Sequence, residues 1–223
     1  MNDPIIKTTR LTEDLLLLAP GSNMDRDHPH LSRLAKLCED QGFSTWRFQF
    51  RYRDEGRPFP PKDISITINE YESHLRQAAL TFPHARLHLG GHSYGARIAT
   101  HVAAKLIASD HQLARRLCSI IVFSLPIHPA KKPHLERWDH IKHLSIPVCL
   151  ISGDRDLLAE PAQLAAFMTQ LPSASKTLTL LSGTDHGFKR LAAYRQQEDP
   201  YAATAKAVNQ FLASVAQGAP TTR

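Results

Sequence analysis

A single serine stands between two glycines where an apolar segment gives way to an alanine-rich one. The segment at residues 87–89 leads into Gly91-His92-Ser93-Tyr94-Gly95, and small apolar residues then recur at helical spacing over residues 96–107. This order is typical of a strand that turns sharply into a helix. Glycines on both sides of the serine remove the Cβ atoms that would collide in such a turn. We therefore expect Ser93 at its apex, in a strained backbone conformation.

Apolar runs alternate with amphipathic patterns along the rest of the chain. Strands are predicted at residues 5–10, 15–19, 43–50, 86–89, 120–124, 148–152 and 177–181. Helices are predicted to carry residues 31–38, 68–82, 96–107, 135–143, 164–171 and 205–215, with loops at 51–62 and 126–133. Regular alternation of this kind predicts a three-layer α/β/α sandwich with a mostly parallel sheet of about six to seven strands.

Length and composition favour one domain. The chain has 223 residues, of which 42% are hydrophobic, enough for a substantial core. We expect one domain over residues 1–216 and a short flexible tail over residues 217–223. No stretch approaches the roughly 20 apolar residues of a membrane span, and the first residues do not resemble a secretory leader. These features predict a soluble, cytoplasmic protein with no membrane partner.

Charge and cysteine patterns argue against a nucleic-acid-binding protein and against a disulfide-rich protein. The net charge is +6, but Lys and Arg are spread along the chain without interleaved aromatic residues. We therefore expect no nucleic-acid partner. The three cysteines, Cys38, Cys118 and Cys149, lie in or beside apolar segments. An odd number in such places predicts free thiols rather than a disulfide framework.

Polar residues follow the last two predicted strands. Gly153-Asp154-Arg155-Asp156 comes after the strand at 148–152, and Asp185-His186 comes after the strand at 177–181. Ligands of parallel sheets bind at the carboxyl ends of the strands, so these residues should approach Ser93. Asp156 is favoured as the acid because it lies in the loop ahead of the next helix. Asp154 stays open as the alternative, and Asp185 is interpreted as structural because it is adjacent to His186.

A serine, an aspartate and a histidine in this order can perform acyl transfer. Ser93 would attack a carbonyl carbon, His186 would accept and return its proton, and Asp156 would orient the imidazole. The negative oxygen of the intermediate needs backbone N–H donors, which form an oxyanion hole. Tyr94, directly after the nucleophile, is one expected donor. The other is expected from Ser22 or Gly21, in the loop after the strand at 15–19.

Other residues are assigned to the expected site by their position in the sequence alone. Tyr52, Ile127, His128 and Phe188 are candidate walls of a substrate pocket. Arg51, Arg53 and Arg57 follow the second long strand and would either attract an anionic acyl substrate or form a solvated basic loop.

The segment before the first helix holds acids and histidines that could bind a metal ion. Its members are Asp25, Asp27, His28 and His30. A polar loop with an N-cap for the following helix is the preferred interpretation. Hydrolysis by a triad needs neither a metal nor a cofactor, and none is expected.

With these residues the chain resembles the α/β-hydrolase fold superfamily, and more narrowly its small lidless, dienelactone-hydrolase-like branch. That branch includes the hydrolase-like domain of a subunit of the non-specific lethal chromatin complex and a testis-expressed vertebrate protein. The resemblance extends over about residues 15–212. It rests on Met24-Asp25, Arg47-Phe48-Gln49-Phe50 with Tyr52, Gly91-His92-Ser93-Tyr94-Gly95, Pro126-Ile127-His128-Pro129 with Lys132-Pro133, Gly153-Asp154-Arg155-Asp156 and Asp185-His186.

The resemblance implies a triad of Ser93, Asp156 and His186 at a nucleophile elbow. Members often carry His-Gly-Ala-Gly after the first core strand, where this chain has Pro20-Gly21-Ser22-Asn23. The sequence thus predicts a serine hydrolase of carboxylesterase or thioesterase type that acts on a small acyl substrate through an acyl-enzyme intermediate. Two alternatives stay open. The intact triad set favours an enzyme, which includes an acyltransferase, and the altered first loop favours a non-catalytic interaction module.

Overall fold

One seven-stranded sheet runs through the molecule. The computed structural model describes residues 5–7, 12–109, 111–129, 132 and 138–218. The strands are β1 (Ile5–Lys7), β2 (Asp14–Ala19), β3 (Ser44–Arg47), β4 (Arg86–His92), β5 (Leu117–Phe123), β6 (Val148–Gly153) and β7 (Lys176–Leu181). They lie in the order β1-β3-β2-β4-β5-β6-β7, and neighbours are parallel except at β1, which runs antiparallel to β3.

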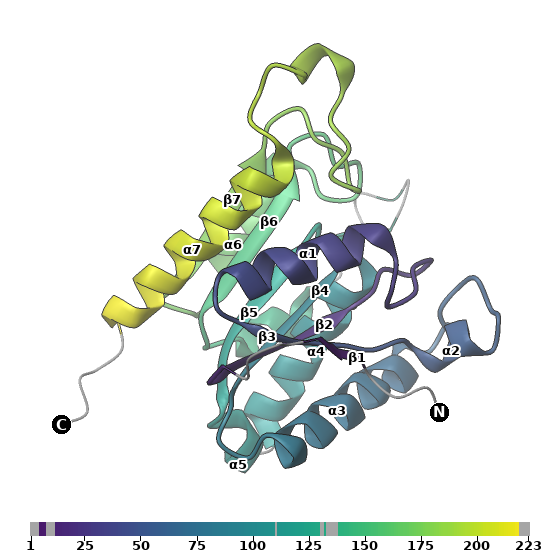
Figure 1. Cartoon of the computed structure of the whole chain (residues 1–223), viewed down its shortest axis with the longest axis vertical. Coiled ribbons are helices and arrows are strands. Elements are labelled where there is room, and N and C mark those ends of the chain that lie inside the picture. The colour runs from purple at the N-terminus through teal and green to yellow at the C-terminus, as the bar shows by residue number, and fades with distance from the viewer. Residues whose placement is uncertain (1–4, 8–11, 110, 130–131, 133–137, 219–223) are drawn as a thin grey trace.

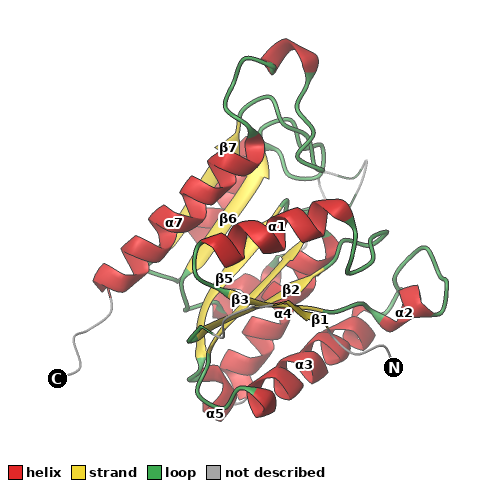
Figure 2. Ribbon diagram, viewed as in Figure 1, coloured by secondary structure: helices red, strands yellow, loops and turns green. Residues whose placement is uncertain are grey.

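Helices cover both faces of this sheet (Figure 1) (Figure 2). They are α1 (Pro29–Asp40), α2 (Arg51–Asp54), α3 (Ile64–Thr81), α4 (Tyr94–Ser109), α5 (His111–Ala114), α6 (Pro161–Gln170) and α7 (Pro200–Gly218), with 3₁₀ turns η1 (Asp139–His143) and η2 (Ala192–Tyr194). Alternate leucines of β2 point to opposite faces. Leu16 and Leu18 pack with α1 and α7, whereas Leu15 and Leu17 pack with α3, α4 and α6. The predicted three-layer α/β/α architecture is confirmed.

The strand order places two loops side by side at one edge of the sheet. The chain moves outward from β2 to β3 and then returns to β4, which pairs with β2 on its other side. Ala19, the last residue of β2, pairs with Gly91 near the end of β4. The loops that follow these two strands therefore begin together, as is typical of ligand sites in open parallel sheets.

Several elements differ from the sequence-based expectation. The strand predicted at 43–50 is shorter because β2 pairs with β3 only up to Arg47, and the buried Phe48 and Phe50 continue outside the ladder. The loop predicted at 51–62 contains α2, and α5 was not predicted. The helix predicted at 135–143 is a 3₁₀ turn where it is described, and residues 135–137 lie outside the described residues.

The elements at the two ends of the chain also differ in length from the expectation. The edge strand expected at 5–10 is present as β1, and residues 8–10 lie outside the described part. The last helix continues through residues 217 and 218, where a flexible tail was expected, and residues 219–223 are not described. In the described residues, no helix is long and apolar enough to cross a bilayer. The three cysteines are free thiols, as predicted, and Cys38 and Cys149 are buried.

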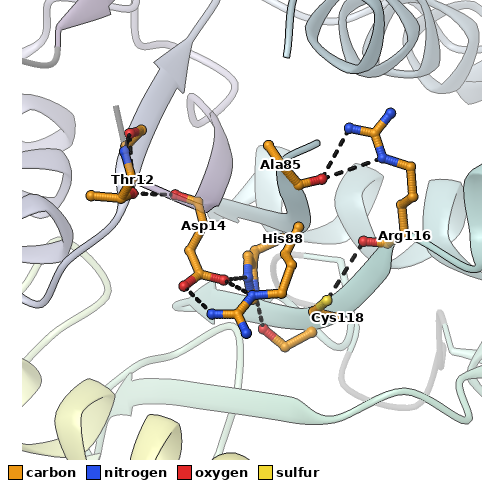
Figure 3. Close-up of polar contacts among 9 residues, drawn as sticks. Thr12, Asp14, Ala85, His88, Arg116 and Cys118 are labelled. Atoms are coloured by element: carbon orange, nitrogen blue, oxygen red, sulfur yellow. Dashed lines mark hydrogen bonds and ion pairs between the residues drawn. The ribbon is translucent and has the colours of Figure 1, made fainter. Parts of the chain in front are cut away.

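A buried Ser-His-Asp chain, separate from the predicted triad, lies at the amino ends of β2, β4 and β5 (Figure 3). The ring of His88 contacts Asp14 Oδ1 through Nε2 at 2.9 Å and Ser119 Oγ through Nδ1 at 2.7 Å, and Arg86 Nε also donates to Asp14 at 2.7 Å. His88 and Ser119 are buried, so the group ties β2, β4 and β5 together instead of offering a nucleophile to a substrate. Nearby, the Arg116 guanidinium donates to the Ala85 carbonyl at 2.9 Å, which fixes the loop before β4.

Candidate active site

Ser93 occupies the turn between β4 and α4. Its φ of +53° lies in the left-handed region that non-glycine residues rarely adopt. A Cβ on Gly91 would lie 2.5 Å from the carbonyl carbon of Gly95, and one on Gly95 would lie 2.4 Å from the oxygen of Ala19. Both distances exclude any larger residue without a backbone shift. The predicted strained turn with Ser93 at its apex is therefore present, and the flanking glycines allow it.

The structure brings Ser93, His186 and Asp156 into one hydrogen-bonded chain. His186 Nε2 lies 2.8 Å from Ser93 Oγ, and His186 Nδ1 lies 2.7 Å from Asp156 Oδ2. A carboxylate only accepts, so Nδ1 carries the proton and Nε2 accepts the serine hydroxyl. This is the tautomer in which an imidazole can remove the serine proton.

The three aspartates near His186 have different surroundings. Asp156 is 2% exposed, and its carboxylate also accepts from the N–H of Leu158 at 2.8 Å and from Ser152 Oγ at 3.2 Å. These donors aim one oxygen at His186. Asp154 instead faces Arg155, with 3.6 Å between Oδ1 and Nε. Asp185 accepts the N–H groups of residues 187 and 189, each at 2.9 Å, and shapes the loop that carries His186.

The loop after β2 lies against the nucleophile. A Cβ on Gly21 would lie 3.5 Å from Ser93 Cβ, and Ser22 lines the cavity in front of Ser93. Tyr94 is the first residue of α4, where backbone N–H groups have no partner within the helix. The expected oxyanion-hole residues thus surround Ser93. Tyr52 holds this loop, because its hydroxyl donates to the Ser22 carbonyl at 2.7 Å.

Two hollows flank the hydrogen-bonded chain. A cavity of about 360 Å³ opens in front of Ser93, with Lys62, Arg97 and His128 in its wall. A second, more open hollow of about 640 Å³ is lined by His186, Leu157 and Leu191 among others. Leu158 lines both hollows, so they adjoin each other.

Of the four residues expected to line a substrate pocket, one is among the described residues that line these hollows and three are not. His128 lines the cavity beside Ser93. Tyr52, Ile127 and Phe188 are not among the described residues that line either hollow. Tyr52 lies behind the loop after β2, Ile127 is buried in the core with α4, and Phe188 packs 5.2 Å from the ring of His30.

The arginines after β3 are not among the described residues that line these hollows. Arg51 and the half-buried Arg53 lie in α2, and the exposed Arg57 follows that helix. Arg51 and Arg57 both pair with Glu55, and the Arg51–Glu55 distance is 3.0 Å. Arg53 donates to the side chain of Asn23 at 3.3 Å. Their local pairing is that of a solvated basic loop.

The acid and histidine segment before α1 is engaged in local structure. His28 caps α1 by accepting the N–H of His30, and Asp25 accepts the N–H of Asp27 at 3.0 Å. The ring of His30 turns inward and bonds the hydroxyl of Tyr201 at 2.6 Å. Over the described ranges no group of three or more metal-ligating side chains gathers. The preferred interpretation of this segment as a polar loop with an N-cap is confirmed.

Sequence reasoning missed a buried histidine beneath the site. His92 Nε2 lies 3.0 Å from the backbone oxygen of His186, and the ring of His30 packs edge-on against His92 at 4.5 Å. Burial lowers the pKa of His92 well below its ordinary value, and the nearby imidazoles of His30 and His186 lower it further. Burial likewise lowers the pKa of His30 to about 4. The one available signal was the position of His92 directly before the nucleophile.

Known proteins share this fold and sequence pattern. Residues 12–213 match the family described as the alpha/beta hydrolase domain. An alpha-beta serine hydrolase homologue from Coxiella burnetii has a TM-score of 0.68 at 16% identity, covering 95% of this chain and 97% of that one. Dienelactone hydrolase from Anabaena variabilis has a TM-score of 0.67 at 18% identity, covering 92% of this chain and 88% of that one.

A third solved structure completes the comparison. Est1E from Butyrivibrio proteoclasticus, in a structure with bound ferulic acid, has a TM-score of 0.70 at 13% identity, covering 96% of this chain and 95% of that one. At identities of 13–18%, the similarity to these structures shows the fold alone. The family match covers most of the chain, and with the turn at Ser93 on this fold it identifies the chain as a member of the alpha/beta hydrolase family.

Proposed function

We propose that the protein is a serine hydrolase that cleaves small carboxylic esters or thioesters. The observation that carries this proposal is the chain of hydrogen bonds from Asp156 through His186 to Ser93, at 2.7 and 2.8 Å. The chain opens on a cavity of about 360 Å³, which suits a short acyl group. The names of two structural neighbours, a serine hydrolase homologue and a dienelactone hydrolase, agree with this reaction class.

The first half of the reaction acylates Ser93. The hydroxyl oxygen attacks the substrate carbonyl carbon while His186 Nε2 takes the hydroxyl proton. The N–H groups of Tyr94 and of Ser22 or Gly21 stabilise the negative oxygen of the tetrahedral intermediate. The bond from carbon to the leaving oxygen or sulfur then breaks, and His186 donates its proton to the leaving group. Asp156 stabilises the imidazolium that forms between these two proton transfers.

The second half regenerates the enzyme. A water molecule attacks the acyl carbon, gives a proton to His186 and releases the carboxylic acid, and His186 returns the proton to Ser93. The turn at Ser93 keeps its oxygen at the cavity wall during both halves. The hollow beside the half-buried His186 leaves room for the water.

Labelling with a fluorophosphonate probe tests for an activated serine. The wild type should label, Ser93→Ala should not, and His186→Ala should label at least roughly 10²-fold more slowly because the serine loses its base. Short esters and thioesters of increasing acyl length should then be hydrolysed, with activity falling for long chains. A folded wild type that neither labels nor hydrolyses any of them would reject the proposal in favour of a non-catalytic interaction module.

A further inference from the structure

Two exposed leucines lie in the hollow beside His186. Leu157 is 84% exposed and Leu191 is 42% exposed, and both line the hollow of about 640 Å³ together with His186 and Leu158. Single exposed leucines are common on protein surfaces. Several that line one hollow form an apolar wall against which a ligand can bind.

A tight turn fixes Leu157 next to the expected triad acid. Leu157 directly follows Asp156, whose carboxylate lies 2.7 Å from His186 Nδ1. The N–H of Leu158 donates to the other oxygen of this carboxylate at 2.8 Å, and the N–H of Ala159 donates to the Asp156 carbonyl at 3.3 Å. The backbone on both sides of Leu157 is therefore held, while its side chain stays in solvent.

A hairpin holds Leu191 on the same loop as His186. The N–H of Asp185 donates to the Lys189 carbonyl at 3.0 Å, and the N–H of Leu191 donates to the Gly183 carbonyl at 2.8 Å. His186 lies in the tip of this hairpin and Leu191 at its base. Figure 1 shows the loop between β7 and α7, which contains the hairpin, beyond the ends of β6 and β7. Backbone hydrogen bonds thus set both leucines relative to the triad residues.

The path of the proton places the leaving group at this hollow. His186 Nε2, which lies 2.8 Å from Ser93 Oγ, must pass its proton to the leaving oxygen or sulfur. The leaving group must therefore lie against the ring of His186, whose side chain is 27% exposed and lines this hollow. A chain attached to the leaving atom then extends toward Leu157 and Leu191.

The charged side chains of the hollow favour an uncharged leaving group. Arg155 is the one lysine or arginine among the described residues that line it, and its guanidinium lies 3.6 Å from Asp154 and bonds the Tyr194 hydroxyl. Asp185 and Glu160 add negative charge to the same wall. A phosphate or carboxylate on the leaving group would face these acids, and Arg155 is already engaged.

We propose that this hollow binds the leaving half of the substrate and prefers an uncharged apolar alcohol or thiol. Leu157 and Leu191 are the residues that determine this preference. During acylation the bond from the carbonyl carbon to the leaving oxygen or sulfur breaks, and His186 gives that atom the proton taken from Ser93. The free alcohol or thiol then departs along the leucines. The inference rests on the proposed function and adds the class of leaving group to it.

Three esters separate the two halves of the substrate. Butyl acetate and ethyl butanoate are isomers that carry the longer chain in the leaving group or in the acyl group, and ethyl acetate is their common reference. Both acetates form the same acetyl-Ser93, so their kcat/KM values differ only through the leaving half. The wild type should prefer butyl acetate over ethyl acetate by roughly three- to tenfold, since one fully buried CH₂ group contributes about fourfold.

A charged ester tests the preference for an uncharged group. In 4-acetoxybutanoate a carboxylate replaces the terminal methyl group of butyl acetate. Its kcat/KM should not exceed that of ethyl acetate, because the carboxylate faces the acids of the hollow. A value equal to or above that of butyl acetate would overturn the proposed preference.

Two leucine variants test the residues. Leu157→Ala and Leu191→Ala should each lower the preference for butyl acetate over ethyl acetate by about two- to threefold. The ratio of kcat/KM for ethyl butanoate and ethyl acetate should stay at the wild-type value. Leu80→Ala is the matched control, because Leu80 is 83% exposed in α3 and is not among the described residues that line either hollow. It should change neither ratio.

The outcomes for this inference and for the proposed function are distinguishable. A wild type that labels with fluorophosphonate but does not prefer butyl acetate would overturn the inference while the activated serine stands. A preference untouched by both leucine variants would overturn it as well, and so would an equal loss in Leu80→Ala. A folded protein that neither labels nor hydrolyses any of these esters would reject the hydrolase and this inference with it.

Discussion

His92 Nε2 donates a hydrogen bond to the backbone carbonyl oxygen of His186 across 3.0 Å. The two residues are 94 positions apart in the sequence, and His92 is the last residue of β4, directly before Ser93. This bond ties the turn that carries the nucleophile to the loop that carries its base. A Cβ on Gly21 would lie 3.2 Å from the other nitrogen of the same ring, so His92 also supports the loop after β2.

We therefore expect His92 to act as a positioning residue. His92→Leu should lower kcat and the rate of fluorophosphonate labelling roughly five- to tenfold, as for the loss of about 1 kcal/mol from one buried hydrogen bond. KM should change little because His92 does not line the cavity. His92→Gln keeps an N–H donor and should recover part of kcat.

The control for this experiment separates positioning from general destabilisation. His84→Gln changes an exposed histidine in the loop before β4 and should alter neither kcat nor the unfolding temperature. If His92→Leu lowered the unfolding temperature while kcat of the folded fraction stayed at the wild-type value, the bond to His186 would have only a structural role.

Asp156 is expected to contribute more to the rate than its neighbour Asp154. Asp156→Asn preserves the size of the side chain but no longer fixes the proton on His186 Nδ1, so kcat should fall by about 10³–10⁴-fold. Asp154→Asn affects a carboxylate that faces Arg155, and it should leave kcat within about twofold. Steady-state hydrolysis of a short ester measures both. Comparable losses in the two variants would argue that the loop adopts another arrangement during catalysis.

Tyr52 should influence transition-state binding from behind the loop after β2. Tyr52→Phe removes the hydroxyl that holds the Ser22 carbonyl at 2.7 Å, so the expected oxyanion donors become less well placed. We expect a loss of roughly tenfold in kcat and in affinity for a boronic acid, which mimics the tetrahedral intermediate, with little change in KM. Tyr194→Phe removes a hydroxyl that bonds Arg155 and serves as the control. Unchanged boronic acid affinity in Tyr52→Phe would mean that the loop keeps its position without this bond.

The sequence predicted those parts of the site that depend on local order. Ser93 follows from the two glycines around it, and the place of Asp156 follows from the rule that side chains after parallel strands share one edge of the sheet. The sequence favours Asp156 over Asp154 only through the positions of the two residues within one loop. The structure supplies the donors, Leu158 N–H and Ser152 Oγ, that turn Asp156 toward His186.

Other parts of the site depend on contacts between distant segments and could not be predicted. Lys62 enters the cavity wall from the loop between α2 and α3, and the sequence of that loop has no periodic pattern that indicates this position. The expected pocket wall Phe188 follows His186 closely, yet its φ of +61° directs the side chain into the core beside α1 and α7. The length of β3 was also overestimated, because its pairing with β2 ends at Arg47 although the apolar pattern of the sequence continues to Phe50.

The amino edge of the sheet offers a test of stability against pH. Burial alone would raise the pKa of Asp14, but the hydrogen bonds from His88 and Arg86 outweigh it and hold this pKa well below its ordinary value. A carboxylate whose pKa is lower in the folded state stabilises that state at pH values above its unfolded pKa of about 3.9. The contribution is lost as the pH falls toward the folded pKa.

Asp14→Asn should therefore lower the free energy of unfolding by about 1–2 kcal/mol at pH 7, a range reduced for partial exposure of the carboxylate. The difference from the wild type should shrink steadily below about pH 4. Urea unfolding at several pH values between 3 and 7 measures it. Asp40→Asn, an exposed change at the end of α1 beside Lys36, should have an effect of at most a few tenths of a kcal/mol. A deficit in Asp14→Asn that is equally large at pH 3 and pH 7 would show that the shape of this side chain, and not its charge, ties β2 to β4.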